Sequence, residues 1–259
     1  MSFRRPAPRG AGVGNLLRTS VRLFQASLLK CLPLAMLAVL CASLPNIYWN
    51  ASGHPISLFG PYDTTFRVLS VFGLTSALWL FGALMLRQRA LGLGAGPLLG
   101  AELLASLRRL PALLAGVVLA DLSMVAVLLL VLALAPGAPL ALNGLALLPG
   151  VFLLVCYLVL LPVMLLDQAG PLTALARSVR IVRPLWWQAL TALVIAVLLS
   201  FLGALIFAAV LGVAADLLAG NGAAMKAVVN AGVVGFYALF VVYVSALQLV
   251  LHSAASNSA

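Results

Sequence analysis

Long apolar stretches alternate with short polar segments along this sequence, and six of the stretches approach or exceed the length of a membrane span. A helix needs about 20 predominantly apolar residues to cross the hydrocarbon core of a bilayer. The pattern therefore predicts an all-α fold, a polytopic bundle of six transmembrane helices. The predicted spans are approximately Cys31–Trp49, Val68–Leu86, Leu110–Ala135, Leu145–Leu166, Trp187–Val213 and Ala227–Leu251.

We expect residues 1–259 to form a single integral membrane domain. Residues 1–14 are predicted to be a disordered basic tail in the cytoplasm, and residues 252–259 a second cytoplasmic tail. Four prolines fall near predicted helix ends or at a predicted kink, where neighbouring helices can satisfy the freed backbone groups. They are Pro33, Pro111, Pro149 and Pro162.

A short amphipathic stretch precedes the first, third and fifth spans, and its apolar positions are spaced by three or four residues, as on one helix face. Amphipathic helices with basic residues lie in the membrane interface, apolar face toward lipid and cations toward phosphates. The chain is therefore predicted to hold three units, each an interfacial helix followed by a transmembrane hairpin. The apolar sets are Leu17, Val21, Phe24 and Leu28; Leu99, Leu103, Leu107 and Leu110; and Leu172, Leu175, Val179 and Val182. The opposite faces are predicted to carry Arg18, Arg22 and Gln25; Glu102, Ser106 and Arg109; and Thr173, Arg177 and Arg180.

A local string also returns in these stretches, as Ser20-Val21-Arg22, Ser106-Leu107-Arg108 and Ser178-Val179-Arg180. Internal duplication would explain the recurrence. The alternative is that cytoplasmic loops of inner-membrane proteins are commonly Arg-rich and amphipathic, so each stretch could have arisen separately. The sequence leaves both explanations open.

The positions of the basic residues predict the orientation. With the N-terminus in the cytoplasm, all basic residues except Arg67 and Lys226 fall in cytoplasmic segments, as the positive-inside rule requires. Both ends of the chain are therefore expected in the cytoplasm. The residues expected to contact lipid headgroups are Arg18, Arg22, Arg108, Arg109, Arg177, Arg180, Arg183, Trp186 and Trp187.

Composition agrees with a membrane protein and excludes a soluble domain. Apolar residues make up 64% of the chain and charged residues 8%, whereas a soluble domain has about 25% charged residues. The net charge is +10, but the basic residues sit at the ends of apolar runs instead of forming one face with interleaved aromatic residues. A nucleic-acid partner is therefore not expected.

Asp121 is the polar residue that is most informative about function, because it falls near the middle of the third predicted span. An acid there is costly, so we expect it to face the bundle interior. It could couple transport to a proton or cation, or it could make a structural hydrogen bond to a neighbouring helix, for example to Asn230. A stripe of small residues beside it would let another helix approach closely: Ala112, Gly116, Ala120 and Ser123.

Other reactive residues do not form a recognisable site. His54 and His252 are expected on opposite sides of the membrane, and the three cysteines lie within apolar runs with no C-x-x-C spacing. We therefore expect no catalytic residues, no metal and no cofactor. Asp167 could pair with Arg177 or Arg180 at the cytoplasmic face.

The segment Leu161–Leu190, LPVMLLDQAGPLTALARSVRIVRPLWWQAL, carries a family resemblance. It resembles uncharacterised bacterial six-helix inner-membrane proteins related to the membrane domain of glycerophosphoryl diester phosphodiesterases. In those phosphodiesterases catalysis resides in a separate soluble barrel, so the resemblance implies a membrane module without hydrolase activity. The matching positions are Pro162, Asp167, Ala174, Leu175, Ser178, Arg180, Trp186 and Trp187.

Two hypotheses for function follow. The first is a non-enzymatic module of the bacterial inner membrane that acts in envelope or lipid homeostasis, with anionic membrane lipids as partners. The second is a small-molecule or ion transporter that uses a buried Asp121. The small residues Gly203, Ala208 and Gly212 are compatible with a homo-oligomer, although packing within one chain explains their spacing equally well.

Overall fold

The computed structural model describes residues 12–52, 62–96, 98–134, 148–217 and 222–256, and within these ranges every regular element is a helix. The long helices are α1 (Val13–Ala51), α2 (Thr64–Gly92), α3 (Leu99–Leu134), α8 (Trp186–Leu217) and α9 (Gly222–Ser256). The short ones are α5 (Leu148–Tyr157), α6 (Leu160–Leu166), α7 (Pro171–Val182) and the 3₁₀ turn η1 (Arg183–Leu185).

Six described segments are long and apolar enough to cross a membrane, and each overlaps one of the predicted runs. They are Val13–Trp49, Thr64–Gly92, Leu99–Val127, Leu148–Leu166, Pro171–Phe207 and Gly232–Ser256. The prediction of an all-α chain with six apolar segments long enough to span a membrane is confirmed for the described residues.

The helices extend beyond the predicted spans. α1 begins at Val13 and has 39 residues, so the first amphipathic stretch and the first span form one continuous helix about 58 Å long at 1.5 Å per residue. Residues 1–11 lie outside the described part of the chain. At the other end α9 continues to Ser256, so residues 252–256 prolong the last helix.

The fourth span is interrupted. α5 ends at Tyr157 and α6 begins at Leu160, with two turn residues between them. Pro162 lies inside α6 and has no N–H to offer the carbonyl four residues earlier, that of Leu158, so the interruption falls where the backbone loses this bond. Pro162 is one of the four prolines predicted to lie near a helix end or at a kink, whereas α1 runs through Pro33 and α3 through Pro111 without ending.

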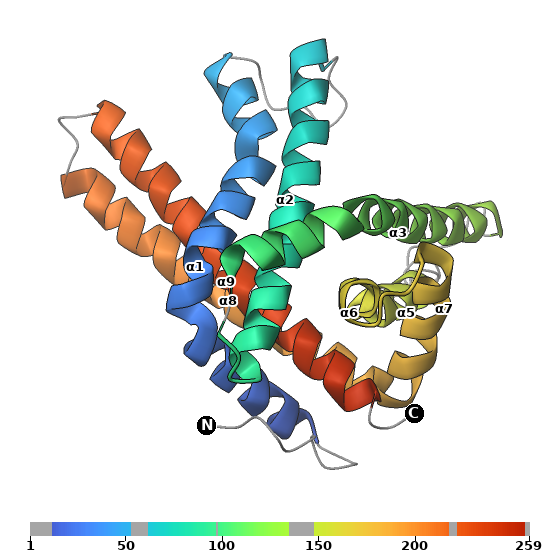
Figure 1. Cartoon of the computed structure of the whole chain (residues 1–259). Coiled ribbons are helices and arrows are strands. Elements are labelled where there is room, and N and C mark those ends of the chain that lie inside the picture. Colours follow the sequence, from blue (N-terminus) through green and yellow to red (C-terminus); the bar gives the residue numbers. More distant parts are fainter. Residues whose placement is uncertain (1–11, 53–61, 97, 135–147, 218–221, 257–259) are drawn as a thin grey trace.

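The helices diverge from one packed end of the molecule. In Figure 1 the first turns of α1, the last turns of α2 and the last turns of α9 lie together in the lower part of the view. The far halves of α1, α2, α8 and α9 reach toward the upper part, and the far half of α3 points to the right. α1 packs against both α2 and α9, and α3 packs against α2 and α7. The larger core cluster joins the start of α1, the α5–α7 region, the start of α8 and the end of α9.

Each amphipathic stretch buries one face against the rest of the protein, whereas the sequence predicted helices that lie in the membrane interface with the apolar face toward lipid. In α1 the buried positions are Leu16, Ser20, Leu23 and Ser27, while Val21 of the predicted apolar set is exposed. The recurring serines Ser20, Ser106 and Ser178 are all fully buried, and Glu102 is only 8% exposed. Placing Glu102 and Ser106 on a polar outer face was therefore wrong. Small hydroxyl side chains let helices approach closely and can bond within their own helix, so they occupy the packed face.

Candidate functional site

The richest cluster of polar side chains lies where α1, α2 and α3 meet. Arg87 of α2 faces Glu102 in the first turn of α3, with Nη1 and Oε2 3.5 Å apart, and both side chains are largely buried. This separation exceeds that of an N–H···O hydrogen bond. Accordingly, the Nε and Nη1 atoms of Arg87 and both carboxylate oxygens of Glu102 have no hydrogen-bond partner among the described residues.

Gln88, the next residue, ties three helices together. Its Nε2 donates to the Ser27 hydroxyl of α1 at 3.1 Å and to the Val242 carbonyl of α9 at 2.9 Å. Its Oε1 accepts from the Ser245 hydroxyl at 2.6 Å. Gln88, Ser27 and Ser245 are all fully buried. Every polar atom of the Gln88 side chain is thus engaged, which fixes the register of α2 between α1 and α9.

Two hydrogen bonds hold α2 and α3 together. The indole Nε1 of Trp79 donates to the Leu103 carbonyl at 2.9 Å, and the Ser106 hydroxyl donates to the Trp79 carbonyl at 2.7 Å. Gly82 lies against the Ser106 hydroxyl so closely that a Cβ at residue 82 would collide with it. Trp79 is therefore positioned by α3 as well as by its own helix.

A groove of about 530 Å³ opens beside these bonds. α1 and α2 line most of it, and the start of α3 closes one side. Its lining is apolar apart from two cations and a few small polar groups. The lining residues are Lys30, Pro33, Leu34, Leu37, Cys41, Phe72, Ser76, Trp79, Leu80, Arg87, Leu99 and Leu103.

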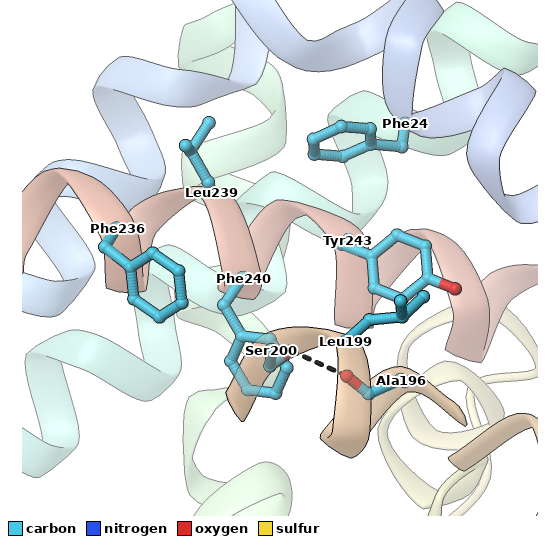
Figure 2. Close-up of a pocket in the computed structure, with 8 residues that line it drawn as sticks. All are labelled: Phe24, Ala196, Leu199, Ser200, Phe236, Leu239, Phe240 and Tyr243. Atoms are coloured by element: carbon cyan, nitrogen blue, oxygen red, sulfur yellow. Dashed lines mark hydrogen bonds between the residues drawn. The ribbon is translucent and has the colours of Figure 1, made fainter. Parts of the chain in front are cut away.

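A second, smaller pocket of about 220 Å³ lies between α1, α8 and α9. Figure 2 shows Phe24 of α1 on the side of α9 that carries Leu239 and lies nearest Tyr243, while Phe236 and Phe240 of α9 point toward α8 with its Ala196, Leu199 and Ser200. Phe24 meets Tyr243 edge to face, with ring centroids 5.9 Å apart. The Ser200 hydroxyl donates to the Ala196 carbonyl at 2.7 Å, so the pocket has apolar walls and offers a ligand little to recognise beyond shape.

Asp121 does not face the interior. Its side chain is exposed on the surface of α3, and it lines neither of the two cavities above. The expectation that this acid would point into the bundle was therefore wrong. Ser123 is placed as a packing residue, because its hydroxyl lies 2.9 Å from the Tyr157 hydroxyl of α5. The side chain of Asn230 lies outside the described residues.

The small-residue stripe on α3 lies against α6. Gly116 and Ala120 are buried, and a Cβ on Gly116 would meet the Met164 side chain of α6. The stripe thus receives a side chain of α6, and the close backbone approach predicted for it stays a prediction.

Asp167 lies at the junction of α6, α7 and α9. Its Oδ2 is 3.3 Å from Arg177 Nη2 and 3.1 Å from His252 Nε2. The pairing of Asp167 with Arg177 was predicted; the contact with His252 was not, because residue 252 had been assigned to a tail. His252 is buried, so the end of α9 belongs to the packed part of the molecule.

The residues predicted to contact headgroups lie mostly on the surface. Arg18, Arg22, Arg108, Arg177, Arg180, Arg183 and Trp187 are exposed, while Arg109 and Trp186 are partly buried. Trp186 stacks on Phe152 of α5 with ring centroids 5.8 Å apart, so it also fixes the start of α8.

No protein-family model matches this chain, and no curated protein or solved structure shows significant similarity to it. The resemblance carried by Leu161–Leu190 therefore stays a prediction. Within the described residues no three His, Cys, Asp or Glu side chains are grouped as a metal site would need.

Proposed function

We propose that this chain is a non-enzymatic, multi-pass module of the bacterial inner membrane that acts in envelope or lipid homeostasis. In this proposal both termini are cytoplasmic, and three Arg-bearing helical segments contact anionic headgroups of the cytoplasmic leaflet. The observation that carries it is the pairing of exposed arginines with exposed large apolar side chains on the same helical segments.

The pairing recurs in α1 and in the region of α7. Arg18 and Arg22 are exposed on the same side of α1 as Leu29, which lies about two turns beyond Arg22 and is 83% exposed. Leu172, 71% exposed, precedes the exposed Arg177 by about a turn and a half of α7. Such a surface would place apolar side chains among acyl chains and guanidinium groups among phosphates, which is how interfacial helices bind.

The transport hypothesis lacks an observation in its favour. It needed Asp121 in a polar cavity, whereas this acid is exposed on α3 and lines neither described cavity. We therefore do not carry it forward as a second proposal.

Lipid preference measured by electron paramagnetic resonance tests the proposal. The chain is reconstituted in phosphatidylcholine bilayers that contain a trace of spin-labelled phosphatidylglycerol or spin-labelled phosphatidylcholine. Since each cation near an anionic membrane contributes about 1 kcal/mol, we expect the wild type to prefer the phosphatidylglycerol label several-fold. The preference should fall when four exposed arginines are replaced by glutamine, namely Arg18, Arg22, Arg177 and Arg180.

Arg67→Gln is the control, because Arg67 is an exposed cation predicted to lie on the opposite side of the membrane. It should leave the preference at its wild-type value. Equal association of both labels with the wild type, or an undiminished preference in the four-residue variant, would show that these arginines do not bind anionic headgroups.

A further inference from the structure

The groove between α1, α2 and α3 is cationic at one end and apolar along its length. Gln88 bonds to Ser27, and Gly73 lies directly against the Cys41 carbonyl. α1 and α2 are therefore antiparallel, with Lys30 near the level of Arg87 at one end of the groove.

The groove has the length of one leaflet. Its lining on α1 runs from Lys30 to Cys41, which is about 16 Å at 1.5 Å per residue. Half of a hydrocarbon core that is about 30 Å thick measures about 15 Å. A molecule with its charged group beside Lys30 would thus lay an acyl chain along Leu34, Leu37 and Phe72 within a single leaflet.

The side chains at the cationic end of the groove carry one positive charge that no carboxylate of the described chain neutralises. Arg87 faces Glu102, and Lys30 has no carboxylate partner among the described residues. These three groups together carry one net positive charge. Nη1 of Arg87 lies against the Glu102 carboxylate, whereas its Nε is buried without a hydrogen-bond partner in the described chain, so the positive charge at this end is not fully compensated by the chain.

We propose that this groove binds one anionic glycerophospholipid, its phosphodiester beside Lys30 and Arg87 and one acyl chain along the apolar wall. A monoanionic phosphodiester matches the single surplus charge, and its oxygens are acceptors for the exposed Lys30 ammonium, with the positive charge of Arg87 close by. A free phosphate would leave the apolar length of the groove empty, so the lipid is the occupant that fits both parts.

The part of the groove wall formed by Trp79 is held in place by hydrogen bonds within the protein, independently of any bound lipid. Trp79 lines the groove and is held by its bond to the Leu103 carbonyl, while Ser106 holds the Trp79 carbonyl. A site whose walls are already in place loses little conformational freedom on binding. This distinguishes one retained lipid from the exchanging lipids around the rest of the surface.

The inference rests on the proposed function in one respect, because it assumes that this end of the helices meets the phosphate level of a leaflet. The two can nevertheless fail separately. The spin-label preference depends on many exposed arginines, whereas occupancy of the groove depends on Lys30, which is not among the four residues replaced in that experiment.

Native mass spectrometry of the full chain in mild detergent tests the inference, with phosphatidylglycerol titrated as the probe. The wild type should retain one phosphatidylglycerol at concentrations at which phosphatidylethanolamine and glycerol phosphate leave it empty. Lys30→Glu should weaken phosphatidylglycerol binding by about tenfold or more, since it replaces a charge-assisted contact by repulsion. Leu37→Trp, which fills the groove without changing charge, should abolish it.

Arg108→Glu is the matched control, because it makes the same change of charge at an exposed α3 residue that does not line the groove. It should bind the lipid as the wild type does. Lys30 and Leu37 are exposed, so both variants should fold, and unchanged helical circular dichroism checks this. Wild-type affinity in Lys30→Glu and Leu37→Trp, or equal retention of phosphatidylethanolamine, would overturn the proposal.

Discussion

Replacing Gln88 by leucine should destabilise the packed end of the molecule by about 2 kcal/mol. The substitution keeps the side-chain volume nearly constant and removes three hydrogen bonds, to Ser27, to the Val242 carbonyl and from Ser245. Interhelical hydrogen bonds in membrane proteins average about 0.6 kcal/mol each, so three of them give roughly 2 kcal/mol.

The cost should stay near this sum, because the two serines keep other partners. The Ser27 hydroxyl also bonds to the Leu23 carbonyl, and the Ser245 hydroxyl to the Val242 carbonyl. Neither is left buried without a partner, so the larger penalty of an unsatisfied group does not apply.

Unfolding in sodium dodecyl sulfate, followed by circular dichroism, gives the free energy for the purified protein in detergent micelles. Gln25→Leu is the control, since Gln25 is an exposed residue of α1; its stability should lie within about 0.5 kcal/mol of the wild type. If Gln88→Leu were as stable as Gln25→Leu, the bonds of Gln88 would not contribute as the structure indicates.

Two further pairs of substitutions probe other contacts in the same assay. Gly73→Ala should destabilise the protein by about 1–3 kcal/mol because its Cβ meets a backbone carbonyl of α1. Gly100→Ala, with nothing near its Cβ, should raise helix stability by up to about 1 kcal/mol; equal effects of the two would contradict the close packing of α1 on α2. Asp167→Ala should cost about 1–3 kcal/mol by leaving the buried His252 ring nitrogen without its partner. Arg177→Gln should cost less than about 1 kcal/mol because this guanidinium is half exposed. A larger loss of stability in Arg177→Gln than in Asp167→Ala would contradict the inference that the bond from Asp167 to His252 contributes more than its ion pair with Arg177.

The apolar runs were sufficient to predict the six candidate spans, because a helix that lies in lipid hydrocarbon must be apolar over its whole length. The break in the fourth span could also be anticipated, since Pro162 has no N–H to donate. Helix limits were less predictable: α1 and α3 continue through their amphipathic stretches, and only the third stretch forms a separate helix, where Gly170 and Pro171 begin α7.

The candidate site was largely missed. Gln88 lies just beyond the predicted end of the second span at Leu86 and was not singled out, although Leu80, Leu84 and Gln88 share one helix face. Its partners on α1 and α9 lie 61 and more than 150 residues away in the sequence, and such pairings cannot be derived from local periodicity. Glu102 was predicted on the polar face of its amphipathic stretch, because a charged residue is assumed to be solvated until its partner is known.

The proposals on lipid binding share one premise, that the basic ends of α1, α2 and α7 face the cytoplasm. Reporter fusions test it most directly, with green fluorescent protein, which fluoresces in the cytoplasm, and alkaline phosphatase, which is active outside it. Fusions at Gly94 and after Ser256 should fluoresce, and phosphatase fusions at Asn143 and Gly220 should be active. Active phosphatase at Gly94 together with fluorescence at Asn143 would contradict the orientation and, with it, the proposed contact of the Arg-bearing segments with the cytoplasmic leaflet.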